Sequence, residues 1–294
     1  MGDALANLVE LLSHDRTWLA SSCAGLGLIV GSFLNVVVHR LPRMLDADWR
    51  AQCAELEGRA APGTPRFDLI HPASRCPRCE HPIRWYENLP VLSWLALRGR
   101  CSACRAPIAL RYPLVELASG FVALACALRF GWGAGLAAAL LLSWALLALA
   151  LIDFDHQLLP DDITLPLLWL GLLASLVPVF VAPRAAIVGA AVGYLSLWVV
   201  YHLYKALTGK EGFGYGDFKL LAMLGAWAGP LAILPVVLLA SVAGAAVGLA
   251  LVATGRASFG KPLAFGVYLC PAAWLYLMWG EAWVARYLAL AARG

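Results

Sequence analysis

Two short stretches place carboxylates at the ends of apolar segments. The first, L-I-D-F-D-H-Q-L-L-P-D-D-I-T from Leu151 to Thr164, joins two apolar segments and contains Asp153 directly after one of them. The second, G-F-G-Y-G-D-F-K from Gly212 to Lys219, places Asp217 at the start of another apolar segment. Carboxylates are costly to keep at the edge of hydrocarbon, so they are usually functional there. We therefore hypothesise that Asp153 and Asp217 meet at one membrane face as an acid/base pair.

Such a pair has a defined chemistry. Two carboxylates in one low-dielectric site cannot both ionise comfortably, so they hold one proton between them. The ionised member can activate water while the protonated member polarises a scissile carbonyl, and neither acid is given a fixed role. The alternative is a proton relay in a proton-coupled transporter. A transporter predicts acids near the membrane midplane, whereas these two acids lie at loop junctions.

The other polar residues of the first stretch have plainer interpretations. Asp161 or Asp162 is well placed as the N-cap of a helix that begins near Ile163. Asp155 is interpreted as a solvated loop residue or a helper of the acid pair, and His156 as a solvated loop residue or a group that tunes the acid pair.

Four cysteines form a second cluster, as the pairs C-P-R-C and C-S-A-C with 21 residues between them. Four thiolates on two tight turns give the tetrahedral sulfur cage that Zn²⁺ accepts, with no position open for catalysis. Reduced thiols or a redox pair are the alternatives. A membrane-anchored zinc module that binds partners would explain the cysteines but not the acids. The predicted ligands of a structural zinc ion are Cys76, Cys79, Cys101 and Cys104.

The remaining sequence predicts the membrane elements that position these clusters. Of the 294 residues, 62% are hydrophobic and only 14% are charged, against about 25% charged residues in ordinary soluble domains. Several continuously apolar runs reach the ~20 residues that a helix needs to cross a bilayer. We predict an all-α polytopic membrane protein of about eight transmembrane helices. The expected spans are residues 18–38, 113–130, 134–152, 163–181, 184–204, 218–234, 236–253 and 263–290.

Three regions follow from these spans. Residues 1–38 form an N-terminal segment and the first transmembrane helix, in which Gly27 and Gly31 should allow close approach of another helix. Residues 39–112 form a cytoplasmic zinc-binding module of loops and short strands, and residues 113–294 form a seven-helix transmembrane core. Four acidic side chains of the module are expected to be solvated, or to attract a basic peptide: Glu55, Glu57, Glu80 and Glu87.

Arginine placement predicts the orientation of the chain. Twelve of the 22 Lys and Arg residues lie between Arg40 and Arg111, and all twelve are arginine. With this segment in the cytoplasm, 17 basic residues lie on the cytoplasmic side and five on the other side, as the positive-inside rule expects. Asp153 and Asp217 then share the cytoplasmic boundary. Nucleic-acid binding is not indicated, because seven carboxylates are interspersed among these arginines.

These motifs resemble those of a known family. G-Y-G-D, ending at Asp217, is similar to the GxGD signature of intramembrane aspartyl proteases. D-F-D-H-Q-L-L-P-D-D-I-T-L-P resembles the first-aspartate segment of bacterial prepilin peptidases, the type IV leader peptidases. G-S-F-L-N-V-V-V-H-R-L-P from Gly31 to Pro42 and the C-P-R-C/C-S-A-C loop are also similar. The resemblance covers most of the chain, from about Gly31 to about Pro271.

The resemblance implies a multi-pass enzyme of the bacterial inner membrane whose active site faces the cytoplasm. It implies cleavage of prepilins and pseudopilins after a glycine that ends a short basic leader, with Asp153 and Asp217 in the two catalytic positions. Family members with this cysteine loop often also methylate the new N-terminal amine, using S-adenosylmethionine. The residues themselves contain no Rossmann-type methyl-donor motif, so no residues are assigned to that second activity.

Overall fold

The computed structural model describes residues 10–59, 66–209, 214–256 and 264–291. Across these ranges the chain is helical, and its only β pairing is two isolated bridges. It divides into two compact units, Met1–Leu136 and Ala137–Gly294. The first unit contains α2 (Arg16–Leu56), η1 (Trp85–Asn88), α3 (Leu92–Ala96) and α4 (Arg111–Phe130).

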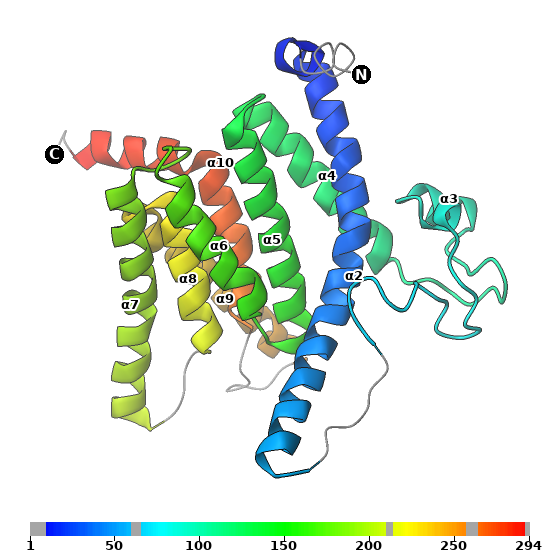
Figure 1. The fold of residues 1–294 in the computed structure, drawn as a ribbon. Helices are drawn as coiled ribbons and strands as arrows, with labels where there is room; N and C mark the ends of the chain where they lie inside the picture. The colour runs from blue at the N-terminus through cyan, green and yellow to red at the C-terminus, as the bar shows by residue number, and fades with distance from the viewer. Residues whose placement is uncertain (1–9, 60–65, 210–213, 257–263, 292–294) are drawn as a thin grey trace. The chain divides into compact units, whose positions relative to one another are not determined.

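Helices α2 and α4 pack closely against each other (Figure 1). A Cβ atom added to Gly27 would lie 2.7 Å from the carbonyl oxygen of Ser119, and one added to Gly31 would lie 2.7 Å from the Cα atom of Glu116. The Ser119 hydroxyl also donates to the Gly27 carbonyl at 2.6 Å. The predicted close approach of a second helix at these two glycines is confirmed.

The first helix is longer than its apolar part. Loops and short strands were expected from residue 39 onward, but α2 continues to Leu56, so that prediction is wrong for this segment. The extension is rich in good helix formers such as Ala, Leu, Arg and Glu, and Arg50 pairs with Asp46 one turn earlier at 2.9 Å. Polar helix formers therefore carry α2 beyond its membrane-spanning stretch.

The module that contains the four paired cysteines is fixed to both helices of the first unit. The Arg40 guanidinium of α2 donates to the carbonyl oxygens of Asp68 at 2.9 Å and Pro72 at 2.7 Å. On α4, the Glu116 carboxylate accepts from the Val91 amide at 2.7 Å. Val91 has φ +62°, which is unusual for a β-branched residue. These contacts hold the short elements of the module in place.

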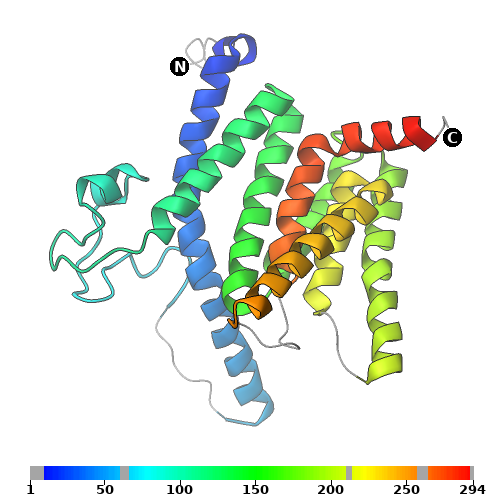
Figure 2. The ribbon, with the colours of Figure 1, turned by 180° about the vertical axis from the view of Figure 1, so that it is seen from behind.

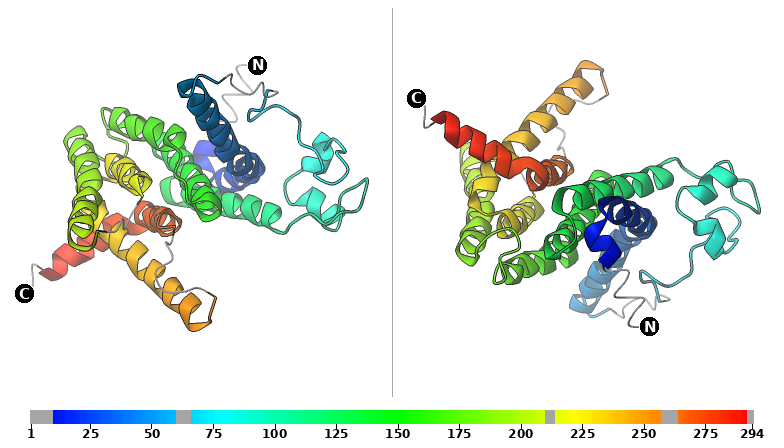
Figure 3. Two further views of the ribbon diagram at one scale, coloured as in Figure 1. Left: turned by 90° about the horizontal axis from the view of Figure 1, so that it is seen from below. Right: turned by 90° about the horizontal axis from the view of Figure 1, so that it is seen from above.

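The second unit is arranged around one short helix. Helix α8 is buried along most of its length and is surrounded by α6, α7 and α10 (Figures 2 and 3). Gly225 of α8 faces Gly189 of α7 so closely that a Cβ on Gly225 would lie 2.0 Å from the Gly189 carbonyl oxygen. The elements of this unit are α5 (Ala134–His156), α6 (Asp161–Ala174), α7 (Pro183–Thr208), α8 (Tyr215–Ala228), η2 (Pro230–Ala232), α9 (Ile233–Ala253) and α10 (Gly266–Ala291).

The expected count of eight spans is not confirmed. A helix occupies each of the eight expected positions, but only five in the described part of the chain are long and apolar enough to cross a membrane: α2, α4, α5, α7 and Pro230–Ala253. Helices α6 and α8 have 14 residues each, fewer than the ~20 that a full crossing needs. Both of these short helices bear acidic residues in their first turns.

The boundary between the last two expected spans before α10 lies elsewhere than predicted. The break was expected at Pro235, but the chain turns at Gly229, which has φ +75°, and continues through Pro230. Pro235 lies in the first turn of α9, where a helix does not need its missing N–H. Glycine at a positive φ value, rather than the proline, therefore divides this apolar run.

Candidate functional site

The ends of two helices bring Asp153 and Asp217 together in the second unit. Asp153 was expected just beyond its helix, but α5 continues to His156 and places this acid in its last turn. Asp217 is the third residue of α8. Both side chains are buried, with exposed fractions of 5% and 6%. Asp153 lies near enough to Asp217 for the two carboxylates to interact electrostatically. The arrangement brings two carboxylates into one buried polar site.

A third helix completes the site, and sequence reasoning did not identify it. The backbone amide of Val267 donates to Asp153 Oδ2 at 3.0 Å. A Cβ atom added to Gly266 would lie 2.8 Å from the same oxygen. Asp153 therefore lies at the N-terminus of α10, where free amides and the helix dipole favour negative charge. The sequence feature that could have indicated this contact is Gly266, near the start of the last apolar run.

Asp217 occupies a similar electrostatic position on its own helix. It lies in the first turn of α8, after the N-cap residue Gly214, and its amide donates to the Gly214 carbonyl at 3.2 Å. Gly216 leaves room for Leu159, whose Cβ would lie 2.9 Å from a Cβ at that position. Leu159 also approaches Gly266, so two glycines allow one leucine to close the site. Gly212 lies outside the described residues.

One buried thiol lies beside the two acids. Cys270 is 1% exposed and is close enough to both Asp153 and Asp217 to interact with their charges. It belongs to α10, one turn beyond Val267. A small, weakly polar side chain at this position acts as a packing residue beside the carboxylates.

The neighbouring polar residues stay outside the buried site. Pro160, rather than an aspartate, is the N-cap of α6, so the N-cap prediction for Asp161 and Asp162 is wrong; both acids occupy the first turn. Asp161 forms an ion pair with Lys219 of α8, with Nζ–Oδ2 at 2.6 Å. Asp155 and His156 are exposed in the last turn of α5 rather than in a loop.

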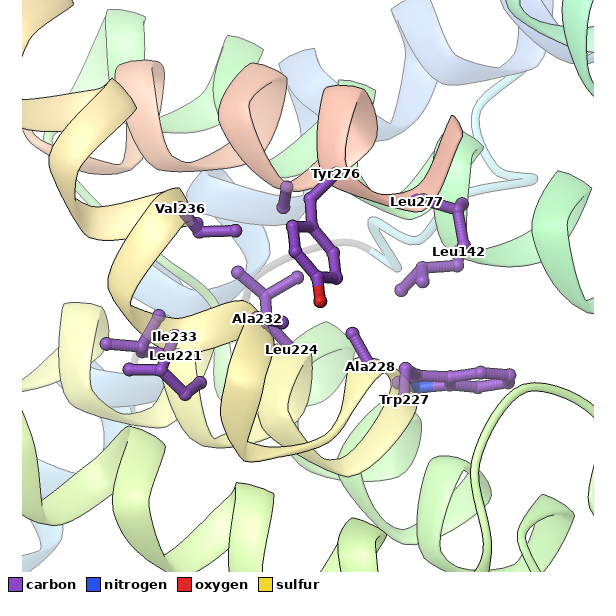
Figure 4. A pocket seen from close by; sticks show the side chains of 11 residues that line it. Leu142, Leu221, Leu224, Trp227, Ala228, Ala232, Ile233, Val236, Tyr276 and Leu277 are labelled. Atoms are coloured by element: carbon purple, nitrogen blue, oxygen red, sulfur yellow. The ribbon is translucent and has the colours of Figure 1, made fainter. Parts of the chain in front are cut away.

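The apolar core of the second unit contains a small cavity. Leu142, Leu224, Trp227 and Tyr276 line a cavity of about 10 Å³ (Figure 4), close to the minimum that holds one water molecule. Tyr276 points its hydroxyl into this space from α10 in Figure 4.

The four cysteines meet in the first unit. Their sulfur atoms all lie within 4.8 Å of one another, with Cys76–Cys104 at 3.8 Å and Cys79–Cys101 at 3.9 Å. Each C-x-x-C pair is followed by two residues and a proline, and an isolated bridge closes each turn, Arg75 with Pro82 and Arg100 with Pro107. The two turns thus repeat one local structure, and together they form a four-sulfur cage that fits a tetrahedral metal ion.

Backbone amides favour the thiolate form at two of the four cysteines. The amides of Arg78 and Cys79 donate to the Cys76 sulfur and lower the pKa of its thiol to about 6. In the second turn, the amides of Cys104 and Ala103 donate to Cys101 and lower its thiol pKa. Hydrogen bonds to the charged form favour thiolates, which are the form that binds zinc.

One glutamate of the module is largely covered, unlike the other three. Glu55, Glu57 and Glu80 are exposed as expected, but the Glu87 side chain is only 10% exposed, so its assignment to solvated surface is wrong. Its carboxylate accepts from the Arg84 amide at 2.9 Å and from Ser102, and the Arg84 amide is the main reason that its pKa lies below the usual value. Glu87 therefore links η1 to the second cysteine turn.

Comparisons with known proteins agree across nearly the whole chain. The Bacterial Peptidase A24 N-terminal domain matches residues 26–130, which contain the four cysteines, and the Type IV leader peptidase family matches residues 140–249, which contain both acids. Three similar proteins are each named prepilin leader peptidase/N-methyltransferase. That of Stutzerimonas stutzeri is 53% identical, covering 96% of this chain and 98% of its own.

The other two relatives are comparably similar. The protein of Pseudomonas aeruginosa is 53% identical over 96% of this chain and 97% of its own length. That of Aeromonas hydrophila is 50% identical over 97% of this chain and 99% of its own length. No solved structure matches the chain.

Proposed function

Because the chain belongs to the type IV leader peptidase family, we propose that it is a membrane aspartyl endopeptidase that removes the leader peptides of prepilins and pseudopilins. The observation that carries this proposal is the buried pair of acids: Asp217 lies in the first turn of α8, and Asp153 of α5 accepts a hydrogen bond from the first turn of α10. We assign both acids as catalytic residues. The proton-coupled transporter has no support in the family matches.

The chemistry follows from sharing one proton between the acids. The ionised carboxylate takes a proton from a water molecule, and the resulting hydroxide attacks the carbonyl carbon of the scissile peptide bond. The protonated carboxylate donates to the carbonyl oxygen as negative charge develops there. The C–N bond then breaks, and the leaving amine takes up a proton from the pair. The helix N-termini at both acids favour the ionised form, so the pair can hold its single negative charge in a buried site.

A prepilin has the right form for this position. Its leader is basic and precedes an apolar helix, so its polar junction would lie at a membrane boundary beside the acids. We propose that this boundary is the cytoplasmic face of the bacterial inner membrane, in accordance with the basic residues of the predicted cytoplasmic loops. Lys210 and Lys261 of these loops lie outside the described residues, as does Arg293 of the opposite side. Cleavage after a glycine is proposed from the family resemblance.

We further propose that the new N-terminal amine is methylated. The relatives' shared name includes N-methyltransferase, and S-adenosylmethionine is the donor that this activity implies. The amine nitrogen would form a bond to the methyl carbon, the carbon–sulfur bond would break with its electrons remaining on sulfur, and the amine would lose a proton. Zinc, held by the four cysteines, would supply structure to the module rather than a catalytic position.

This proposal assigns different tasks to three regions. Residues 1–38 supply the first membrane helix, residues 39–112 the zinc-binding module, and residues 113–294 the seven-helix peptidase core. One experiment tests both activities: the purified protein is incubated with a prepilin and S-adenosylmethionine, and the product is weighed by mass spectrometry. Loss of the leader mass without methyl addition would retain the peptidase and reject the methyltransferase. An uncleaved prepilin would reject the peptidase.

A further inference from the structure

An open pocket on the zinc-binding module has no part in the proposed peptide cleavage. It encloses about 480 Å³, within the range of about 300–1,000 Å³ typical of small-molecule sites. Its polar lining comes from η1, from α3 and from the two cysteine turns. We refer to it as the η1–α3 pocket, and its polar residues are His81, Arg84, Tyr86, Glu87, Ser93 and Ser102.

The fold holds the walls of this pocket together. Trp94 of α3 packs its ring on Gly99, where a Cβ atom would lie 2.8 Å from the ring, and its Nε1 donates to the Ile108 carbonyl at 3.2 Å. Gly99 has φ +65° and precedes the second cysteine turn. The Val91 amide, just before α3, is bound by Glu116 of α4. The pocket is therefore attached to the sulfur cage on one side and to a membrane-spanning helix on the other.

The lining offers opposite charges within one small volume. The Glu87 carboxylate is nearly buried, and the buried Nε2 atom of His81, which has no hydrogen bond in the structure, lies 3.5 Å from it. The Arg84 guanidinium lies over the Tyr86 ring at 5.9 Å and donates to the Tyr86 hydroxyl at 2.6 Å. An arginine has five N–H donors, so further donors remain for a ligand. The pocket thus presents a carboxylate, a guanidinium and an aromatic ring.

We propose that the η1–α3 pocket binds S-adenosylmethionine, with Glu87 facing a cationic centre of the donor and Arg84 facing its carboxylate. This inference rests on the proposed methyltransferase activity. The donor contains an ammonium, a sulfonium and a carboxylate, so it needs both signs of charge in one site. Tyr86 supplies an aromatic face suited to a cation or an adenine ring. The serine hydroxyls supply hydrogen-bonding groups of the kind that fix a ligand's orientation.

The structural metal site and the η1–α3 pocket share the second C-x-x-C turn. Ser102 lies within the second C-x-x-C turn and lines the pocket. A metal ion that holds this turn therefore also holds one wall of the pocket. The residues that would bind the donor are remote in sequence from Asp153 and Asp217, so donor binding and leader cleavage should be separable by substitution.

The test is titration calorimetry of the full, zinc-loaded chain in detergent micelles with S-adenosylmethionine. Ala96 lines the pocket and is exposed, so Ala96→Trp should fill the pocket without disturbing the fold and raise Kd at least ~30-fold. Glu87→Gln should raise Kd at least ~10-fold, because it removes the charge that faces the cation. Ala109→Trp, at an exposed alanine that does not line the pocket, is the matched control and should bind as the unchanged chain does.

Zinc content and leader cleavage are measured on the same samples and should stay unchanged in Ala96→Trp. Unchanged donor affinity in that variant would overturn the pocket assignment while leaving methylation in place. Absence of donor binding by the unsubstituted chain, with cleavage intact, would overturn the pocket and the methylation together but not the peptidase. Glu87 also accepts from the Arg84 amide, so Glu87→Gln can disturb the module itself. If that variant loses zinc, the Ala96→Trp result alone decides the pocket assignment.

Discussion

The cysteine site and the acid site of this chain are assembled in opposite ways. The cysteine site joins two C-x-x-C turns, each closed by its own backbone hydrogen bonds. The sulfurs that meet between the two turns are only 22 and 28 residues apart in sequence. The acid site joins the last turn of α5, the first turn of α8 and the start of α10, and the Asp153–Val267 bond spans 114 residues. Local backbone structure builds the first site, and helix packing builds the second.

This difference predicts how each site can be damaged. A metal ion can stabilise a small module that has little core of its own, so the cysteine site should fail when a ligand is lost. The acid site lies in the core of a helical unit, where close glycine contacts such as Gly225 against Gly189 set the helix positions. It should be sensitive to changes in packing as well as to loss of the acids.

The largest effect should come from the acids themselves. Asp153→Asn and Asp217→Asn preserve side-chain size but remove proton transfer, which contributes about 10²–10⁴-fold to a catalysed rate. Each variant should lower the rate of leader cleavage at least ~10³-fold, measured with a purified prepilin. Zinc content should be unchanged, because the cysteines belong to the other unit. Asp162→Asn, at an exposed acid in the first turn of α6, is the control, and full activity in either catalytic variant would end the dyad hypothesis.

Loss of a zinc ligand should have the reverse outcome. Cys101→Ser removes one of four thiolates, so the metal content of the purified chain should fall to near zero because three ligands leave the tetrahedral cage incomplete. Methyl addition should be lost, whereas leader cleavage should stay within about tenfold. Metal content is measured by mass spectrometry, and Cys53→Ser, at an exposed cysteine of α2, is the matched control. Cleavage lost in parallel with zinc would show that the two regions are not separable.

A smaller effect is expected where packing positions an acid. In Gly266→Ala the new Cβ atom would lie 2.8 Å from Asp153 Oδ2 and 3.0 Å from Leu159 Cδ2, so the carboxylate must shift. Small misplacements of catalytic groups can cost up to ~10²-fold, and we expect kcat for cleavage to fall about 10–100-fold with zinc retained. Gly25→Ala, at a helical glycine with open space around it, should leave kcat unchanged. An equal loss in both variants would point to general destabilisation.

The smallest effect should come from the ion pair beside the site. Lys219 and Asp161 lie 2.6 Å apart, but their side chains are 32% and 48% exposed, and exposed pairs contribute about 0–1 kcal/mol. Lys219→Met should therefore lower cleavage by less than about fivefold. Combining it with Asp161→Asn should cause little further loss, because both substitutions break one contact. A loss comparable to that of Asp217→Asn would show that Lys219 takes part in the reaction.

Much of the local chemistry could be read directly from the residues. The C-x-x-C spacing predicted the four-sulfur cluster, and Gly27 and Gly31 predicted close contact with another helix, because short-range spacing fixes which groups share a turn or a helix face. That the contacting helix is α4 came from the structure. Helix ends were less accurate: α2 continues to Leu56 and α5 to His156. Apolar runs indicate where hydrocarbon can be crossed, whereas polar helix formers extend the helices beyond it.

By itself, the sequence determined the helical membrane class, the sulfur cluster and the identity of the two acids as candidates, since composition and spacing are properties of the chain alone. Only the tertiary structure decided that α10 meets Asp153 through Gly266 and Val267, and that Glu87 is largely covered beside an open pocket. No periodicity relates these segments. Their contacts arise from the packing of helices distant in sequence and from the folding of loops around the cysteine turns.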